Sequence, residues 1–526
     1  MLHLLPLTRS ILDPIHGLVR LTREEMRLID APLYQRLRYI KQNGVLHLVF
    51  PSATHTRFEH GIGTVFVVNA MLESLIYNSE ASAAKLYTLR EASPGRALQF
   101  SKLRRETLRD IFRVARIAAL LHDIGHGPLS HSFDPFAPRR ADVRRLFETS
   151  SVLAPLREFA ELLVNPSSET PEDSAGDPEA STDHEAISCL FACKVLHEVA
   201  SGEDPPAPET ARAVAAALVG GAVLERVAST HALGGWLHLI HDLVASAPID
   251  ADRMDFVERD SRSCGVSYGL FDRNRLQKSM LCYRAGTRER PAYRLGWKQS
   301  GLRAIENFIA ARFQLYVQIY FHKTNAAINL MLKDIGELAR GSASPLFTAR
   351  DTRALESLCR RYRELTDERF VAELEGAPYG SFHEARAVNE LARAIRARRF
   401  YKRVYEGDAE VVRRAVEAQL EPPRGCGPLK QNTIPLGATK GLDDGAKLLR
   451  LNTHNKYALV GHAGADSWLS ASPLIEMLRS RERDLSRIYS CHPQPEDVDE
   501  PLRELRATLE ALEADVNREG QQPTTT

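Results

Sequence analysis

The chain has 526 residues, of which 44% are hydrophobic and 26% charged, and these globular proportions exclude a fully disordered protein. Its 69 basic and 68 acidic residues give a net charge of +1, so no general basic surface is predicted and nucleic acid is not required as a partner. Seven cysteines favour a reducing compartment over a disulfide framework. We find no apolar run near the roughly 18 residues that span a bilayer, and we expect a cytoplasmic protein without a membrane partner.

Helical periodicity dominates the first two thirds of the chain. Residues 111–121 (IFRVARIAALL) repeat apolar side chains at helical spacing. Residues 165–182 have no large apolar side chain and predict a flexible insertion. Residues 302–332 contain neither proline nor glycine and predict a long buried helix with a break near His322. Because strand signals are sparse, we predict a mainly α-helical fold.

The last third of the chain has a more mixed pattern. Residues 352–421 are helical in pattern and rich in Arg, Glu and Ala, whereas 421–432 (EPPRGCGPLKQN) have the composition of a loop. Residues 447–461 have some strand character. We therefore predict a helical core over residues 1–345 and a smaller, mixed C-terminal region over 346–526 that serves regulation and oligomerisation.

Residues 121–134 (LHDIGHGPLSHSFD) concentrate the side chains that bind metals. His122 and Asp123 end an apolar helical run, and adjacent helical residues diverge by about 100°, so they reach one ion only near a helix end or between packed helices. His60, from RFEHG, and Asp252, from DADRMDF, would complete two imidazoles and two carboxylates. Such a set suits Fe, Mn, Zn or Ni better than Ca and leaves coordination positions for water and a substrate oxygen.

This pattern of H…HD…D resembles the signature of the HD-domain superfamily of metal phosphohydrolases. The wider motifs resemble the HD-domain dNTP triphosphohydrolase family, which includes the catalytic core of the mammalian SAM-and-HD-domain dNTPase and bacterial dGTPase-like relatives. The similar stretches span about the first 325 residues: DPIHG (13–17), DAPLYQRLRYIKQNG (30–44), FPSATHTRFEHGIG (50–63), LLHDIGHGPLSHSFD (120–134), DHEAIS (183–188), IDADRMDFVERD (249–260) and YFHK (320–323).

The resemblance implies an HD-domain helical core that hydrolyses a dNTP to a deoxynucleoside and tripolyphosphate. A divalent transition metal would be held by the two histidines and two aspartates named above, with Mg²⁺ as a candidate companion of the substrate phosphates. His131 is implied as the general acid for the leaving 5′-oxygen, and Asp134 as the carboxylate that orients it. His126 and His184 are implied to contact phosphate.

Six further positions are implied to bind the substrate. Gln42 and Asp260 would hydrogen-bond the sugar 3′-hydroxyl, and Tyr320 would exclude a 2′-hydroxyl. Phe256 and Phe321 stand where the family has a tyrosine and a glutamine, so the base preference does not carry over. Phosphates would be held by three arginines, whose planar guanidinium groups bind phosphate oxygens in pairs: Arg57, Arg253 and Arg312.

The resemblance also implies regulation by a nucleotide that binds between subunits. It would activate a homo-oligomer, either a tetramer or a hexamer. The matching residues are three that read the base, Asp30, Gln35 and Arg38, and three that bind the activator phosphates, Arg275, Arg398 and Lys402.

Two other functions stay open from the sequence. One is another HD-type nucleotide phosphohydrolase, such as a nucleotidase or a cyclic-nucleotide phosphodiesterase, because metal ligands alone do not separate these reactions. The other is a nucleotide-sensing scaffold without turnover. If the protein depletes dNTPs, either nucleotide homeostasis or antiphage defence would be its setting.

Overall fold

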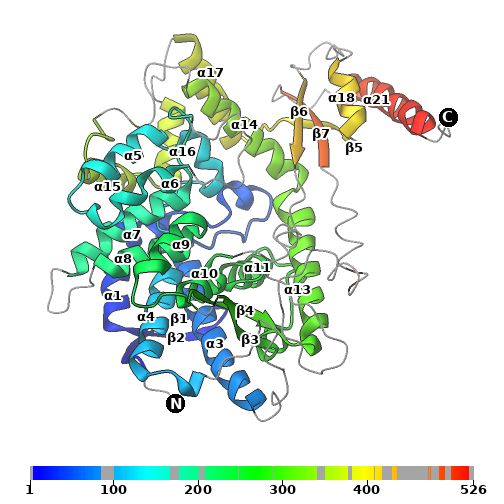
Figure 1. Ribbon diagram of the computed structural model, residues 1–526. Helices are drawn as coiled ribbons and strands as arrows, with labels where there is room; N and C mark the ends of the chain where they lie inside the picture. The colour runs from blue at the N-terminus through cyan, green and yellow to red at the C-terminus, as the bar shows by residue number, and fades with distance from the viewer. Residues whose placement is uncertain are drawn as a thin grey trace.

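The structure, a computed structural model, is mainly α-helical, which confirms the predicted fold class (Figure 1). It describes residues 4–83, 100–165, 177–200, 208–246, 248–287, 289–340, 347, 350–376, 382–407, 409–417, 429–434, 472, 474, 485–491 and 499–520.

The helices alternate with short loops along the whole described chain. The helix predicted over 111–121 lies within α4, where the buried side chains of Ile111, Val114 and Ala118 recur at a spacing of three or four residues. The helices are α1 (Arg23–Asp30), α2 (Pro32–Gln35), α3 (Arg57–Ala83), α4 (Arg105–Leu121), α5 (Arg140–Thr149), α6 (Ala160–Val164), α7 (His184–Ala200), α8 (Pro208–Val219), α9 (Gly221–Thr230), α10 (Trp236–Val244), α11 (Ala251–Ser263), α12 (Arg273–Lys278), α13 (Leu302–Leu315), α14 (Lys323–Arg340), α15 (Leu355–Glu364), α16 (Asp367–Gly376), α17 (Phe382–Arg396), α18 (Ala409–Glu417) and α21 (Asp499–Gly520).

Short 3₁₀ segments and one π-helical turn complete the helical part. The π turn follows α13, and α14 starts three residues after it ends, so the break predicted near His322 is confirmed. These segments are η1 (Arg36–Tyr39), η2 (Gly44–Leu48), η3 (Phe100–Lys102), η4 (Ser130–Phe136), η5 (Ala154–Phe159), η6 (Gln299–Gly301) and the π turn η7 (Tyr316–Tyr320).

Three small antiparallel sheets accompany the helices. The first two are hairpins, in which Asp13 faces Gly17 and Gly286 faces Pro291 across the turns. The third has the order β5-β7-β6, so its middle strand comes last in the chain. The strands are β1 (Leu7–Asp13), β2 (Gly17–Thr22), β3 (Met280–Gly286), β4 (Pro291–Trp297), β5 (Lys402–Gly407), β6 (Leu429–Ile434) and β7 (Leu485–Ser490).

Helix α3 forms the centre of the main core and packs against α4 and α11. It is the one described helix whose length and composition would allow a membrane crossing, over Arg57–Ser79, a span that the sequence analysis did not anticipate. Yet 67% of that window is buried inside the protein. Its apolar surface is therefore used in packing, and the helix holds His60 inside the core.

The main core does not end at the predicted boundary near residue 345. Leu358, Phe370 and Tyr401 are buried in the same cluster as the N-terminal helices. A second, smaller core forms around β5, α18 and α21, with Val411 and Leu509 fully buried in it. The division between residues 345 and 346 falls outside the described residues and stays a prediction.

One local prediction needs correction, and two others fall wholly or mostly outside the described residues, which exclude 166–176 of the predicted insertion. The interpretation of residues 421–432 as a loop is wrong at its C-terminal end, because β6 begins at Leu429, directly after the last proline. The predicted insertion 165–182 is anchored at its described end, where Arg140 N donates to Ala180 O and Thr182 N to Pro138 O. The predicted strand at 447–461 lies outside the described residues.

Candidate active site

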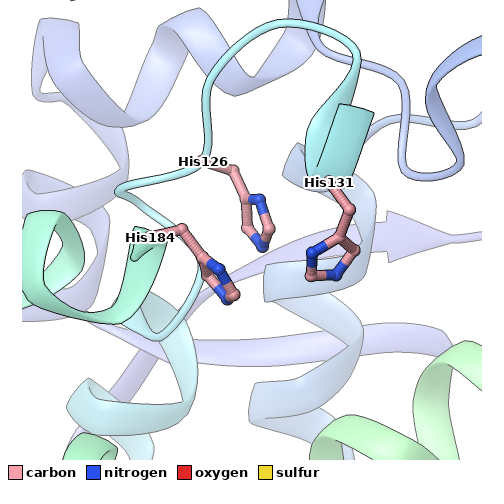
Figure 2. Close-up of side chains that lie close together, drawn as sticks. All are labelled: His126, His131 and His184. Atoms are coloured by element: carbon pink, nitrogen blue, oxygen red, sulfur yellow. The ribbon is translucent and has the colours of Figure 1, made fainter. Parts of the chain in front are cut away.

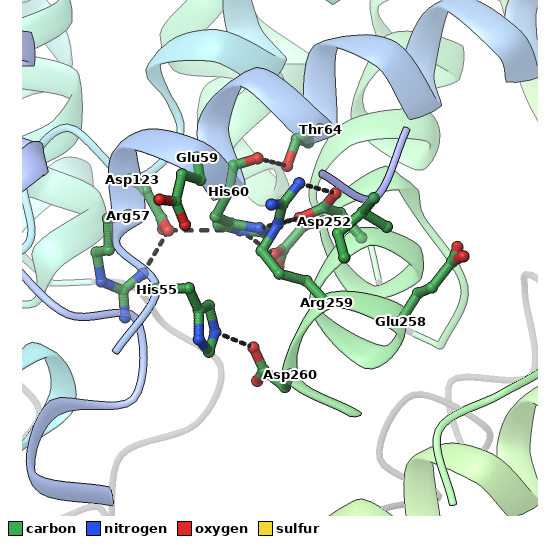
Figure 3. Close-up of polar contacts among 12 residues, drawn as sticks. His55, Arg57, Glu59, His60, Thr64, Asp123, Asp252, Glu258, Arg259 and Asp260 are labelled. Atoms are coloured by element: carbon green, nitrogen blue, oxygen red, sulfur yellow. Dashed lines mark hydrogen bonds and ion pairs between the residues drawn. The ribbon is translucent and has the colours of Figure 1, made fainter. Parts of the chain in front are cut away.

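Four residues from three helices meet at one point in the core. His60 lies in the first turns of α3, His122 and Asp123 directly follow α4, and Asp252 lies in the first turn of α11. Figure 3 shows His60, Asp123 and Asp252 of this group. The Asp250 side chain caps α11 by accepting a hydrogen bond from Arg253 N at 2.8 Å, which fixes where that helix starts. The packing of these three helices therefore positions the four side chains.

The distances within this cluster are short enough for a single ion. His60 Nε2 lies 3.1 Å from His122 Nε2 and 3.0 Å from Asp252 Oδ1. The Oδ2 atom of Asp123 is 3.5 Å from His60 Nε2, and its Oδ1 is 3.4 Å from His122 Nε2. The structure thus brings together all four residues that the sequence predicts as metal ligands, and their coordination of a metal stays a prediction.

The second nitrogen of each imidazole is already occupied. His60 Nδ1 donates to Asp255 Oδ2 at 2.7 Å, and His122 Nδ1 donates to the carbonyl oxygen of Ala119 at 2.8 Å. In the neutral imidazoles, both Nε2 atoms therefore carry lone pairs that face each other. Only a cation or a proton between them makes this arrangement favourable, so the donor set fits a divalent metal.

The electrostatics of the cluster also favour the binding of a positive charge. Burial lowers the pKa of His60, but the hydrogen bonds to Asp252 and Asp255 outweigh it and raise this pKa to about 10. Burial raises the pKa of Asp252, but the imidazoles of His122 and His60 hold it well below its ordinary value. Burial also raises the pKa of Asp123, but the positive charge of Arg57 holds this pKa well below its ordinary value. A metal ion would replace the proton that His60 otherwise retains.

Asp255 supports the cluster from behind and was not assigned a role from the sequence. Besides His60, it bonds Arg259 at 2.8 Å and His16 at 2.5 Å, and Arg259 reaches Asp13 at 2.9 Å. All of these side chains are buried. The sequence signal that would have found Asp255 is its spacing of three residues from Asp252, which puts both on one face of α11.

Three more histidines gather beside Asp123. The rings of His126 and His184 stack with centroids 3.7 Å apart, and His131 meets them at 4.9 and 5.1 Å (Figure 2). Burial, Arg57 and His184 hold the pKa of His126 well below its ordinary value. His131 Nδ1 lies 3.6 Å from Asp134 Oδ2, so the predicted acid and its orienting carboxylate are neighbours.

Gly125 shows why the loop between α4 and η4 needs small residues. A Cβ atom at this position would lie 2.2 Å from Ser188 N and 2.4 Å from His184 O. The loop therefore touches the backbone of α7 directly, and Gly125 N donates to Ser188 Oγ at 2.9 Å. This contact sets His184 next to the histidines of the loop.

A cavity of about 640 Å³ opens in front of both clusters. Its wall includes most of the residues that the sequence predicts for catalysis and substrate binding: Gln42, Arg57, Asp123, His126, His131, His184, Asp252, Arg253, Asp260 and Tyr320. Arg312 lies behind this wall and is 2% exposed, with its guanidinium carbon 5.3 Å from the ring centroid of Tyr316. Its Nε and Nη1 atoms have no hydrogen-bond partner among the described residues.

Several of these wall residues hold one another in place. Arg57 forms an ion pair with Asp123 and donates to Ser130 Oγ at 2.9 Å, and Arg253 pairs with Asp250. At the other side of the cavity, Asp260 accepts a hydrogen bond from the Tyr320 hydroxyl at 2.6 Å. The other oxygen of Asp260 lies 2.7 Å from His55 Nε2, a partner that the sequence analysis did not name.

Sequence reasoning missed part of the wall. Phe256 and Phe321, the two departures from the family pattern, both line the cavity. Asn325 and Asn329 lie within six residues after the YFHK motif, so their place in the sequence was a signal, whereas Asn432 on β6 had none.

The residues predicted to bind an activator lie on several elements. Gln35 Oε1 accepts from Arg38 Nε at 2.8 Å, so two base-reading candidates are in contact close to Asp30 in the chain. Arg275 donates to the Ser300 carbonyl and Arg398 to the Leu48 carbonyl. Lys402 lines a separate cavity of about 670 Å³ with Lys323, Arg403 and Arg506. Their nucleotide-binding role stays a prediction.

Comparison with known proteins bears on these assignments. No protein-family model matches the chain. The chain is 28% identical to deoxynucleoside triphosphate triphosphohydrolase SAMHD1 of Gallus gallus over 410 residues, covering 76% of this chain and 56% of that protein. It is 40% identical to the Homo sapiens protein of that name over 147 residues, covering 28% and 20%. It is 29% identical to the uncharacterized protein YwfO of Bacillus subtilis over 326 residues, covering 61% and 54%.

The chain spans about half the length of the curated relatives that it matches over most of its own length. The predicted resemblance is confirmed: homologues of this chain include HD-type dNTP triphosphohydrolases. The helical core and the His/Asp cluster agree with that relationship.

Proposed function

We propose that the protein hydrolyses dNTPs to deoxynucleosides and tripolyphosphate in the cavity described above. One observation carries the proposal: the two carboxylates of the His/Asp cluster, Asp123 and Asp252, border the same cavity as the three histidines, two arginines and the Asp260–Tyr320 pair. A triphosphate needs cationic and hydrogen-bonding groups along one side, and a deoxyribose needs a shape-selective wall on the other. The similarity to SAMHD1 of two vertebrates supports the same reaction.

The residues that would hold the metal are His60, His122, Asp123 and Asp252. Two imidazole nitrogens and two carboxylates favour Fe, Mn, Zn or Ni. When bound, such an ion lowers the pKa of water and neutralises phosphate charge. Asp255 keeps His60 in the tautomer that offers Nε2 to the ion.

The phosphate end of the substrate would lie against Arg57, Arg253, His126 and His184. Arg57 is 3% exposed and already tied to Asp123 and Ser130, so it presents a fixed charge rather than a mobile one. Fixed donors stabilise developing charge without reorganising during the reaction. Mg²⁺ is a candidate companion of the phosphates on this side.

His131 would donate a proton to the departing 5′-oxygen. Its side chain is 70% exposed within the cavity wall, so it can reach both a substrate and water. Partial enclosure lowers the pKa of His131, but the hydrogen bond and charge of Asp134 outweigh this and raise it above its ordinary value. A larger fraction of His131 is then protonated at neutral pH, as a general acid requires.

The sugar would lie against Asp260 and Tyr320. The hydrogen bond between them fixes the tyrosine ring, so the ring forms a rigid wall. Gln42 Oε1 is buried without a hydrogen-bond partner among the described residues, and a 3′-hydroxyl would satisfy it. Ribonucleotides would be rejected by contact of their 2′-hydroxyl with this wall.

The test is incubation of the purified chain with Mn²⁺ and each dNTP, followed by chromatography of the products. We expect tripolyphosphate and deoxynucleoside from the wild type. The His122→Ala variant should lose its metal, keep its circular dichroism spectrum and form neither product. Monophosphate or diphosphate products would instead indicate another HD-type phosphohydrolase. A metal-loaded protein that yields no product with any dNTP mixture would contradict the proposal and favour a nucleotide-sensing scaffold.

A further inference from the structure

The three histidines beside the cavity already form a face that would suit a single ion. His126, His131 and His184 each offer one ring nitrogen, and these nitrogens lie within 4.8 Å of one another. Figure 2 shows the rings converging from the loop after α4, from η4 and from the first residue of α7. No carboxylate belongs to this group, in contrast to the cluster around His60.

The far sides of two of these rings, those of His131 and His184, are arranged as in metal-binding histidines. His184 Nδ1 lies 3.2 Å from Glu185 Oε2, and His131 Nδ1 lies 3.6 Å from Asp134 Oδ2. A carboxylate at Nδ1 keeps the proton there and directs Nε2 toward an ion. His126 is 1% exposed, and its Nδ1 has no hydrogen-bond partner among the described residues, so part of its hydrogen-bonding capacity is unused.

We propose that His126, His131 and His184 form a second transition-metal site, separate from the site at His60 and His122. Three imidazoles without a carboxylate select Zn²⁺, Co²⁺, Ni²⁺ or Cu²⁺ over Mg²⁺, Ca²⁺ and Mn²⁺. A tetrahedral ion with bonds of about 2.0–2.1 Å needs ligand nitrogens roughly 3.4 Å apart, so the rings must approach by at most about 1.4 Å. The exposed His131 ring can make that movement.

Asp123 lies between the two sites. Its Oδ1 is 3.4 Å from His126 Nε2, and its Oδ2 is 3.5 Å from His60 Nε2. Its negative charge therefore offsets the repulsion between two neighbouring cations. The two sites still differ in composition, and each has ligands that the other lacks.

The second ion would inhibit the enzyme, a consequence that rests on the proposed function. The same three imidazoles are the proposed phosphate contacts and the proposed acid. Once their nitrogens coordinate an ion, His131 has no proton to donate, and the phosphate end of the cavity is occupied. The ion and the nucleotide triphosphate then compete for one face of the cavity.

Counting bound ions tests the site without any reliance on activity. The full chain is stripped with a chelator and titrated with Zn²⁺ by calorimetry and with Co²⁺ by visible absorption. We expect two ions per chain in the wild type, and one in His131→Gln and in His184→Gln. His122→Ala should lose the other ion, while the control His383→Ala, at an exposed histidine on α17, should keep both.

One ion in the wild type, or two in both glutamine variants with unchanged circular dichroism, would overturn the site. Inhibition is tested separately by comparing dNTP hydrolysis at one and at two Zn²⁺ equivalents per chain. We expect the second equivalent to remove most of the rate, and excess dNTP to restore it. A full rate with both sites filled would overturn the inhibition. A chain that binds two ions yet never hydrolyses a dNTP would contradict only the proposed function.

Discussion

At the scale of single residues, the carboxylate of Asp134 governs the protonation of His131. Its ring is reachable from water, and exposure alone would leave it largely unprotonated above neutral pH. The Asp134 side chain is 51% exposed, and among the described residues its ion-pair partner is His131. The pair is therefore suited to tuning an acid rather than to holding the fold.

Replacing Asp134 with Asn should shift the pH dependence of turnover. The acid must be protonated, so the rate falls as pH rises through the raised pKa of His131. Without the carboxylate this pKa drops, and the alkaline limb of the kcat profile should move to lower pH. Profiles of the variant and of the control Asp142→Asn, on the neighbouring α5, provide the measurement. Identical alkaline limbs in all three proteins would rule out a role for Asp134 in tuning the acid.

Tyr320 should determine the choice between deoxyribose and ribose. Tyr320→Ala opens the wall beside Asp260 and should lower the preference for dNTP over NTP in kcat/KM by about tenfold or more, because a steric wall supplies at most about 10² against an added hydroxyl. Tyr320→Phe keeps the ring and loses only the 2.6 Å hydrogen bond, so it should largely retain the preference. A wild type that hydrolyses ATP and dATP equally well would contradict the steric wall.

The sequence predicted the grouping of the four metal-ligand candidates but not the residues that hydrogen-bond and orient the side chains of the site. His60, His122, Asp123 and Asp252 carry a spacing pattern that can be recognised without coordinates. The spacing of Asp255 from Asp252 indicates its place on α11, but its role depends on which ring nitrogen of His60 it contacts, and the sequence does not encode that contact. The same holds for His55, whose bond to Asp260 joins residues more than 200 positions apart.

At the scale of elements, helix α16 from the C-terminal half holds two loops of the active site. The buried carboxylate of Asp367 accepts hydrogen bonds from Leu129 N at 2.7 Å and from Lys41 N at 2.9 Å. Leu129 and Ser130 both have left-handed backbones, with φ of 57° and 56°. Such conformations are costly for these residues, so the surrounding contacts must maintain them.

Asp367→Ala should destabilise the protein and impair catalysis together. Loss of the carboxylate leaves two backbone N–H groups without their acceptor, at a cost of about 1–3 kcal/mol each where they stay buried. Denaturant unfolding should show that loss, and kcat/KM should fall because Gln42 and Ser130 lie next to the released loops. The control is Glu368→Ala, whose side chain is 74% exposed. Equal stability of the two variants would contradict the clamp.

Element predictions succeeded where periodicity is local and failed where pairing is distant. The break near His322 was visible because the apolar pattern is interrupted within a few residues. Strand β6 was missed because its partner β7 lies more than 50 residues later, and the prolines before Leu429 suggested a continuing loop. The hairpin β3–β4 was missed for a different reason: its pairing is local, but its strands alternate poorly between buried and exposed residues.

At the scale of the whole molecule, the candidate activator residues are spread over distant elements. Gln35 and Arg38 follow α1, while Arg398 lies between α17 and β5, and Lys402 is the first residue of β5. A polyphosphate that bridges basic surfaces neutralises charges that otherwise repel. Since a nucleotide that binds only the assembled form must favour assembly, we propose a nucleotide-activated homo-oligomer.

Single dNTPs and mixtures should therefore give different rates and masses. We expect hydrolysis of one dNTP to rise when a second nucleotide is added, with light scattering showing a tetramer or a hexamer. Arg398→Glu combined with Lys402→Glu should abolish the stimulation, and the control Arg386→Glu, on the exposed face of α17, should not. Equal rates and an unchanged mass in every mixture would contradict regulation and leave the catalytic proposal standing.

The position of Asn432 in the cavity wall bears on when the protein becomes active during its synthesis. All four predicted metal ligands have been synthesised once the chain reaches residue 252, whereas Asn432 on β6 follows 180 positions later. Because chains emerge from the N-terminus onward, the ligand residues are available well before the cavity wall is complete. Under the proposed function, a chain that stops before β6 would carry the metal ligands yet leave DNA precursors intact, and hydrolysis would begin only once β6 has joined the cavity wall.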